Sequence, residues 1–424
     1  MRDESGRVPA TARMARVAVS AIFFVHGAVF ASWAARVPAV QSELQLSAGI
    51  LGLVLAGPGL GALAGSQASG LLVRRLGSRA VSAMAPVVLS VPLGLIPMAH
   101  SPWSLMGLLV LLGAADGCTS VAMNAQAVVV QRRYGRAVLN SMHAIRSVGA
   151  VAGALAGVAT AALGLTLTTQ FVIMAVVLAV VSAVAACGLG PDGEPARQAQ
   201  RPKTARVPDA GERDAGERDA GEQDADGQGS NRGITVLLLA LMTFLAALVE
   251  DAPASWSGVY LRHVGADAAT AAAGYAAFSA GEVVTRLLND RMVDRIGWAR
   301  LIRAGTLCCA AALSAALLLG QPGTTLAALV VAGAGISAVF PGVFTAAGGL
   351  PAAAMAMGQV GFAGNLGWLL VSPIIGGLAT VVGLPTALGL LVVAAVTIAG
   401  LAPITRSAGP GRPGARQIAQ EMNN

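Results

Sequence analysis

Long apolar stretches, separated by short polar segments, recur along the whole chain. Each stretch holds about 20 predominantly apolar residues, the length of α-helix that crosses the hydrocarbon core of a bilayer. The pattern predicts twelve membrane-spanning helices, in two sets of six with a polar segment between them. The first set is expected at residues 17–36, 49–72, 80–99, 103–131, 138–163 and 167–189, and the second at 234–261, 268–288, 301–320, 324–346, 357–381 and 384–404.

The composition agrees with lipid as the surrounding solvent. Hydrophobic residues make up 55% of the chain and charged residues 12%, whereas a soluble globular domain carries about 25% charged residues. The cysteines Cys118, Cys187, Cys308 and Cys309 all lie in apolar stretches and form no Cys-x-x-Cys pair, so neither a metal site nor a disulfide framework is predicted. The sequence therefore predicts an all-α membrane protein that needs no cofactor.

Basic residues are concentrated in alternate connecting segments, and this sets the expected orientation. Cytoplasmic loops of membrane proteins collect Lys and Arg, and a cytoplasmic N-terminus places all but three of the 28 basic residues on that side. The exceptions are Arg36 and Arg262, at outer ends of spans, and Arg146, inside a span. We expect a multi-pass protein of the inner (plasma) membrane with both termini in the cytoplasm. The net charge of +7 then reflects this orientation, and no nucleic-acid partner is expected.

A polar segment at 190–233 separates the two sets of spans. It repeats Ala-Gly-Glu-Arg-Asp from Ala210 to Asp219, a composition typical of a solvated, disordered linker, with a regulatory binding role as the alternative. The expected organisation is a cytoplasmic tail at 1–16, a six-helix bundle at 17–189, this linker, a second six-helix bundle at 234–404 and a tail at 405–424.

The two halves resemble each other in sequence. The first span ends in Ala31-Ser32-Trp33 and the seventh in Ala254-Ser255-Trp256, and a basic, glycine-containing turn follows the second span of each half. Two six-span halves in parallel register predict a pseudo-two-fold axis along the membrane normal and a site between the halves. Rocking of the halves would open that site to one side of the membrane at a time.

These features resemble the major facilitator superfamily, whose members carry a G-x-x-x-D-R/K-x-G-x-R/K signature in the turn after the second span of each half. The second half keeps Asp294, Arg295 and Gly297, and the first half keeps Gly70, Arg75, Gly77 and Arg79. The departures are Asp290 in place of the second glycine-starting position and Arg74 in the acidic position of the first half. The resemblance implies a twelve-helix transporter whose first and seventh spans line a central cavity.

Within the superfamily, the chain is similar to a bacterial branch near the fucose–proton symporters. The similarity lies at residues 33–38, 121–126, 142–143 and 250–256. In that group the fourth span often carries an acid four residues before its asparagine, whereas this chain has Ser120 there and Asp116 one turn earlier. The resemblance implies transport of a small solute, coupled to protons, by a monomeric chain embedded in the lipid bilayer.

Ionisable side chains inside the predicted spans are candidates for function, because a charge in the bilayer interior is costly. His26 lies near the middle of the first span, and Glu250 and Asp251 lie before Trp256 in the seventh. We predict that these three residues carry the coupled protons, with His26 and Glu250 as a pair. The alternative for His26 is a neutral imidazole that is hydrogen-bonded within the helix packing.

A second group of charged residues is expected nearer the cytoplasmic face. Arg146 in the fifth span, Asp116 in the fourth and Glu282 in the eighth come out at similar depths. We predict that Arg146 pairs with Glu282, Asp116 or both, and that this pairing closes an inner gate. The alternatives are a permanent pair within one half for Asp116 and a local pair of Glu282 with Arg286 at i+4.

Uncharged polar and aromatic side chains of the spans are candidates for contact with the solute. They are Trp33, Asn124, Gln126, Asn140, His143, Trp256, Gln359 and Asn365. Such polar groups also link helices, at about 0.6 kcal/mol each, so we assign only two or three of them to the solute. The segment Gly57–Gly61 follows no strand and predicts close helix packing rather than a dinucleotide-binding loop.

The function that these features favour is proton-coupled secondary transport of a small organic solute. The sequence has no Gly-x-x-x-x-Gly-Lys-Ser/Thr loop, so the expected energy source is an ion gradient. The spacing of Gly149, Gly153 and Gly157, part of the pattern of the family's antiporters, marginally favours efflux. Kinship with sugar symporters favours uptake of a sugar or other polar nutrient. A membrane sensor that does not transport is a further alternative, while the scattered histidines argue against an enzyme.

Overall fold

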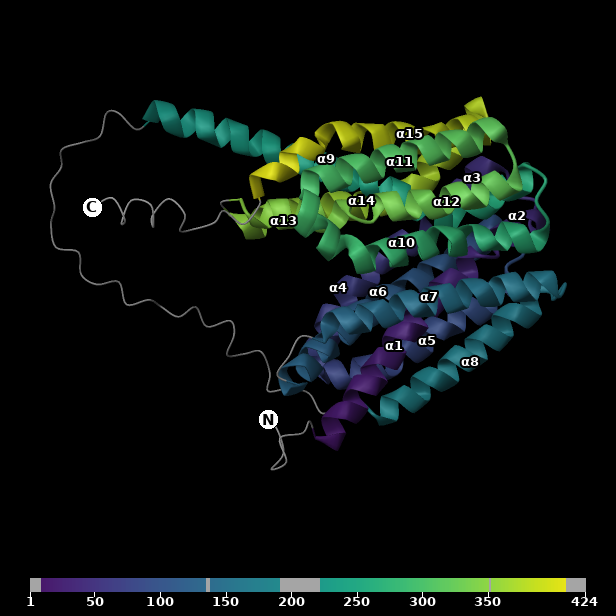
Figure 1. Ribbon diagram of the computed structural model, residues 1–424. Coiled ribbons are helices and arrows are strands. Elements are labelled where there is room, and N and C mark those ends of the chain that lie inside the picture. The colour runs from purple at the N-terminus through teal and green to yellow at the C-terminus, as the bar shows by residue number, and fades with distance from the viewer. Residues whose placement is uncertain (1–8, 135–137, 191–221, 351, 409–424) are drawn as a thin grey trace.

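The structure is a computed structural model, and it describes residues 9–134, 138–190, 222–350 and 352–408. Figure 1 shows long helices in two groups, the first half in purple and blue and the second in green and yellow. The first half contains α1 (Ala10–Ala34), α2 (Val37–Glu43), α3 (Ala48–Val54), α4 (Gly57–Leu76), α5 (Ser78–Leu95), η1 (Ile96–Met98), α6 (Pro102–Tyr134), α7 (Leu139–Ala162) and α8 (Leu167–Cys187). The second contains α9 (Glu222–His263), α10 (Ala268–Ile296), α11 (Trp298–Leu319), α12 (Pro322–Ile336), α13 (Val339–Gly348), α14 (Ala353–Val382), α15 (Leu384–Leu401) and η3 (Ala402–Ala408).

The predicted fold of twelve spans in two six-helix bundles is confirmed. Within the described residues, eleven single helices or consecutive helix pairs are long and apolar enough to cross a membrane. The twelfth span is α10, which has sufficient length at 29 residues but carries charged side chains from Glu282 onward. The start of α1 and the end of α15 lie at the same end of the molecule, as an even number of crossings requires (Figure 1).

Two of the predicted spans are broken in the middle. The span expected at 49–72 is α3 followed by α4, with a break at Leu55–Ala56. The span expected at 324–346 is α12 followed by α13, with a break at 337–338. A proline is tolerated in the first turn of a helix, where its missing N–H has no partner to lose. Pro58 and Pro341 stand in the first turns of α4 and α13, which explains where each second helix starts.

The predicted boundaries of the tail and the linker need correction. α1 begins at Ala10, so residues 10–16, expected in the N-terminal tail, are helical. α9 begins at Glu222, so residues 222–233, expected in the linker, extend the seventh span. The remainder of the linker prediction, at 191–221, lies outside the described residues, as do residues 1–8 and 409–424 of the tails.

Side-chain caps begin three of the helices that start at the predicted outer face. The Ser47, Thr166 and Asp267 side chains accept hydrogen bonds from backbone N–H groups in the first turns of α3, α8 and α10. Such caps satisfy donors that have no partner within the helix. At Asp267, the bonds from the Thr270 backbone and hydroxyl hold the pKa of the carboxyl below its usual value.

Glycines allow the helices of each half to approach closely. A Cβ atom at Gly113 of α6 would overlap the backbone oxygen of Pro58 in α4, and one at Gly65 of α4 would overlap that of Ala114. In the same way, Gly149 and Gly153 of α7 lie against the backbone of α1. The prediction that Gly57–Gly61 serves helix packing is confirmed, since Gly61 contacts the backbone of α6. Small residues of this kind replace the hydrophobic effect as the basis of helix association in lipid.

The signature turns of the two halves share one backbone conformation. Gly77, between α4 and α5, has φ 86° and ψ 155°, and Gly297, between α10 and α11, has φ 77° and ψ 159°. Residues with a side chain rarely adopt a positive φ, so both turns need glycine. The sequence repeat is therefore also a structural repeat.

The contacts between the halves are close at the predicted outer end. A Cβ atom at Gly376 of α14 would lie 2.8 Å from Gly52 Cα and 2.6 Å from Ala48 O of α3. A Cβ atom at Gly258 of α9 would lie 2.5 Å from Pro38 Cγ of α2. Backbones of opposite halves thus touch where α2 and α3 meet α9 and α14.

We expect Gly113→Ala to destabilise the protein, because the new methyl group would force α6 away from α4. Overpacking of this kind costs about 1–3 kcal/mol, and the midpoint of thermal unfolding in detergent, followed by tryptophan fluorescence, should fall. The matched control is Gly107→Ala in the same helix, where a Cβ atom would have no neighbour within 4 Å. Equal midpoints for the two variants would contradict the packing described here.

Candidate functional site

The first half contains a cluster of three ionisable side chains from three helices. His26 of α1 is 4% exposed and lies between Asp116 of α6 and Arg146 of α7. The His26 Nε2 atom is 3.0 Å from Asp116 Oδ1, and Arg146 donates a hydrogen bond from Nε to His26 Nδ1 at 3.1 Å. One imidazole thus links a carboxylate to a guanidinium inside the membrane.

The hydrogen bond from Arg146 defines the protonation state of His26. An imidazole nitrogen that accepts a hydrogen bond carries no proton, so the single proton of this neutral ring is on Nε2. The Nε2–H group faces Asp116 but lies off the line of a well-formed hydrogen bond. The charges of Asp116 and Arg146 balance within the cluster, which lowers the cost of holding them in lipid.

The second half contains a separate cluster on α9 and α10. Arg286 donates from Nη2 to Glu282 Oε1 at 2.8 Å and to Glu250 Oε1 at 3.5 Å. The two carboxylate side chains are 12% and 13% exposed, whereas that of Arg286 is 43% exposed. Asp251 follows Glu250 in α9 and makes no ion pair among the described residues. Three carboxyl groups therefore share one guanidinium.

The two clusters face each other across the boundary between the halves. α7, which carries Arg146, packs against α10, which carries Glu282. The charge of Arg146 acts on Glu282 and on Tyr275 of α10. The Arg146 side chain is also exposed, although it lies eight residues inside its helix. An exposed arginine at that depth needs water rather than lipid beside it, so the clusters adjoin an aqueous cleft.

The predicted pairings are met only in part. Arg146 forms no ion pair with Glu282 or Asp116 among the described residues, and binds His26 instead. His26 and Glu250, expected as a pair, belong to different clusters. The alternative pair of Glu282 with Arg286 at i+4 is present. Sequence counting gave the depth of these groups but not the side of each helix on which they lie.

The polar candidates for solute contact have different positions. His143, Gln359 and Asn365 are exposed, and the His143 ring lies edge-on to Phe23 with centroids 5.0 Å apart. Asn124 is half-buried and donates to the carbonyl of Ser120 in its own helix. Asn140 lies in α7, and its side chain is outside the described set.

Three of the predicted cavity residues are instead part of the packing. Gln126 is fully buried and donates to the Ser78 hydroxyl at 2.9 Å, which links α6 to α5. Trp33 is 2% exposed and packs on Phe171 of α8. Trp256 is fully buried in the second half, where it lines an apolar pocket with Phe278. These positions correct the expectation that the three side chains contact the solute.

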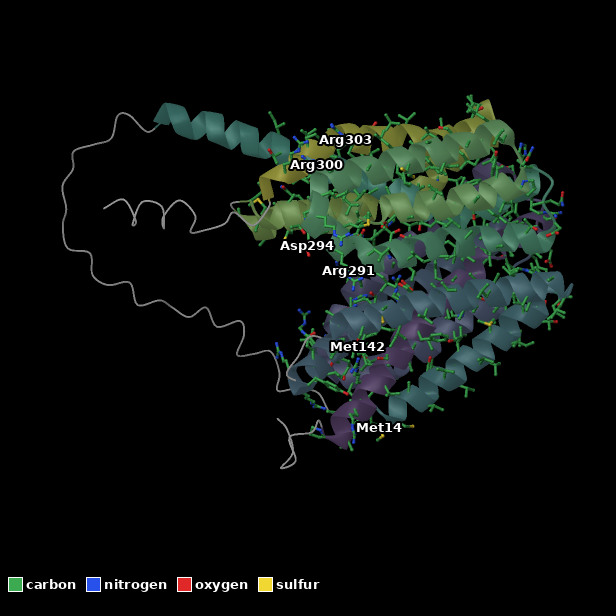
Figure 2. All side chains as sticks on the ribbon, viewed as in Figure 1. Met14, Met142, Arg291, Asp294, Arg300 and Arg303 are labelled. Atoms are coloured by element: carbon green, nitrogen blue, oxygen red, sulfur yellow. The ribbon has the colours of Figure 1, made fainter. Side chains whose placement is uncertain are left out.

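The signature residues lie at the predicted inner end of the molecule. Figure 2 shows Arg291 and Asp294, at the end of α10, near Arg300 and Arg303 of α11. Arg75, Asp294 and Arg295 are exposed, and Gly70 has no neighbour that a Cβ atom would meet. Arg303 donates to the Ala399 carbonyl at 3.2 Å and so joins α11 to α15.

Sequence reasoning did not identify Tyr275 as part of the site. Its side chain lies within electrostatic reach of Arg146, Glu282 and Asp251, which come from both halves. The available signal was weak, because the residue is one of three tyrosines in the chain and stands in an apolar run. Its position on α10 depends on helix rotation, which a linear pattern does not contain.

We expect Arg286→Gln to lower the stability of the protein, since Glu250 and Glu282 lose their shared donor. Loss of a partner for a partly buried charge costs about 1–3 kcal/mol, and the thermal unfolding midpoint should fall accordingly. The double variant Arg286→Gln/Glu282→Gln should recover part of the loss. The matched control is Arg291→Gln, an exposed arginine on the same helix, and an equal loss in this control would contradict the role given to Arg286.

Comparisons with known sequences agree with this architecture. A family model described as Major Facilitator Superfamily matches residues 18–372. An uncharacterized MFS-type transporter of Yersinia pestis is 30% identical over 397 residues, which cover 91% of this chain and 94% of that protein. The membrane protein MosC of Rhizobium meliloti is 26% identical over 90% of this chain and 88% of its own.

Solved structures share the same fold. The nucleoside transporter NupG superposes with a TM-score of 0.70 at 16% identity, covering 93% of this chain and 99% of that one. A bacterial homologue of the human lysosomal transporter Spinster superposes with a TM-score of 0.71 at 16% identity, over 95% and 100% of the two chains. A D-xylose–proton symporter gives 0.67 at 13% identity, over 93% and 98%.

Proposed function

The chain belongs to the major facilitator superfamily, and from that premise we propose that it moves a small organic solute in exchange for, or together with, protons. It is an integral, multi-pass secondary transporter. The transporting unit is one chain, because the cleft between the halves is complete within it. The plasma membrane, with both termini in the cytoplasm, is the location that the distribution of arginines supports.

The observation that carries the proposal is the shortage of positive charge in the second half. Glu250, Asp251 and Glu282 have only Arg286 as a counter-charge. In a medium of low dielectric constant, uncompensated carboxylates favour binding of a proton. A carboxyl group that gains and loses a proton beside an aqueous cleft is a means to couple proton movement to the rocking of the halves. The D-xylose–proton symporter, which has the same fold, supports proton coupling.

The exposed polar side chains support a polar solute. His143, Gln359 and Asn365 offer hydrogen bonds on α7 and α14, one helix from each half. The nucleoside transporter and the D-xylose symporter of the same fold act on polar molecules of this size. A sugar, nucleoside or similar metabolite is therefore the proposed class of solute.

Export by proton antiport is the direction that we place first, with uptake by symport second. Export rests on the spacing of Gly149, Gly153 and Gly157. In the structure, Gly149 and Gly153 serve to pack α7 on α1, which is compatible with either direction. Uptake rests on the polar cleft and on the resemblance to sugar symporters. The sign of the flux decides between them.

In proteoliposomes with an imposed pH gradient, a panel of sugars and nucleosides should show proton-driven flux of at least one solute. Accumulation on the acidic side indicates antiport, and accumulation on the alkaline side indicates symport. Glu250→Gln should reduce this flux to the level of empty vesicles, since its side chain no longer gains a proton. Glu43→Gln, an exposed carboxylate at the outer end of α2, is the matched control. Normal coupling in Glu250→Gln would refute the assignment, and binding without any flux would indicate a sensor.

The orientation can be tested with reporters inserted into connecting segments. A fluorescent-protein fusion in the segment around Ala215 should be active on the cytoplasmic side, and a phosphatase fusion there should be silent. Fusions next to Gly164, in the connection between α7 and α8, should give the opposite pair of signals. The reverse pattern at both positions would show that the topology is inverted.

A further inference from the structure

His26 occupies a position that the proposed coupling at Glu250 leaves unexplained. Its imidazole is the only contact that holds Arg146 to the first half by a printed hydrogen bond among the described residues. That bond requires an unprotonated Nδ1 atom. The arrangement is therefore sensitive to a proton, whereas a merely structural imidazole would be bonded to neutral groups.

We propose that protonation of His26 releases Arg146 from the first half to the carboxylates of α10, and so couples a proton to closure of the inner end. This inference rests on the proposed function, because it adds a second proton-binding group to the same transport cycle. The residues that carry it are Asp116, His26 and Arg146 on one side and Glu282 on the other.

The chemistry of the bond gives the direction of the effect. When His26 binds a second proton, both ring nitrogens become donors, so Nδ1–H faces the Nε–H of Arg146. A hydrogen bond becomes a contact between two donors and two positive charges. The Asp116 carboxylate, 3.0 Å from Nε2, stabilises the imidazolium and takes over as its counter-charge. Arg146 then loses its partner on α1.

Glu282 is the acceptor that Arg146 would meet next. α7 and α10 pack against each other, and the charge of Arg146 already acts on Glu282. Glu282 accepts one bond from Arg286 and retains acceptor capacity on its carboxylate. An ion pair between α7 and α10 would draw the two halves together on the side of the cleft that is open in this structure.

The neighbours of His26 contain no other group that would play its part. Of the helices packed against α1, α6 contributes Asp116, α7 contributes Arg146 and His143, α5 carries only Arg79 in its first turn, and α8 carries no Asp, Glu, Lys, Arg or His. The helices α9 and α10 contribute the second cluster with Glu250, Asp251, Glu282 and Arg286. His143 is the one other imidazole near Arg146, so it must be tested beside His26.

The linkage gives the proton a direction. If protonated His26 favours the closed inner end, the conformation closed on the inside must bind that proton more tightly than the conformation open on the inside. The proton is then taken up while the cleft faces outward and is released when it opens inward. This is the direction in which a proton gradient drives either antiport or symport.

The test measures the inner opening as a function of pH in the full chain. Spin labels are placed at Leu71 of α4 and Leu287 of α10, both exposed, in nanodiscs and in a background without native cysteines. Acidification should shorten the distance between the labels. His26→Gln, whose amide retains hydrogen-bonding capacity but does not titrate, and Arg146→Gln should both abolish the shortening. His143→Gln, the matched imidazole control, should keep it.

Three results would overturn the proposal: no shortening without these substitutions, shortening that persists in His26→Gln, or shortening that is lost in His143→Gln. Should His26→Gln fail to fold, ¹⁵N-histidine NMR of the otherwise unaltered chain decides the point. With the other three histidines replaced by Gln one at a time for assignment, the His26 signal at alkaline pH should belong to the Nε2–H tautomer. An Nδ1–H tautomer would exclude the bond from Arg146 and the proposal with it.

The two proposals fail in different ways. Glu250→Gln should lose proton-driven flux but keep the pH-dependent distance, since His26 and Arg146 are intact. A distance response that follows His26 without any flux in vesicles would refute the transport proposal alone. Flux that depends on Glu250, together with a distance that ignores pH, would refute the role of His26 alone.

Discussion

The cost of a charge in lipid constrains this molecule more than any other interaction, because the parts that carry the charges also have to move. Every ion pair among the described residues lies within one half: His26 with Asp116 in the first, and Arg286 with Glu250 and Glu282 in the second. The halves can therefore separate without leaving a charge unpartnered in the membrane. Across the boundary, the closest approaches involve glycine and backbone, as at Gly52 and Gly376. Small residues hold the outer contact, and charge is kept near the cleft.

The number and position of the spans could be predicted from the sequence because they follow from local quantities. The length of each apolar stretch, the arginines between stretches and the two glycine-containing turns are all visible in one dimension. The breaks inside two spans were not predicted, since an apolar run looks the same whether or not two residues in it leave the helix. Pro58 was a signal for the first of these breaks. The helical start of α9 was missed because its composition resembles that of a linker.

The site could be predicted only in part, for a geometric reason. Counting along helices gave similar depths for Asp116, Arg146 and Glu282, but the partner of each depends on the rotation of its helix. That rotation is fixed by packing, for example by Gly149 and Gly153 against α1. The same limit explains Gln126 and Trp256, whose chemistry suits a cavity but whose side chains face neighbouring helices or a pocket within one half. The pair of Glu282 and Arg286 was predictable because its spacing is local.

The break at Leu55–Ala56 divides one span between two mechanical bodies. Its inner segment, α4, lies against α6 of its own bundle, while its outer segment, α3, lies against α14 of the opposite bundle. An outward opening must either pull α3 off α14 or bend the chain at this elbow. Because the elbow already lacks continuous helical hydrogen bonding, bending there breaks fewer backbone bonds than bending an intact rod. A short articulated arm thus connects two bundles that would otherwise meet as separate rigid blocks.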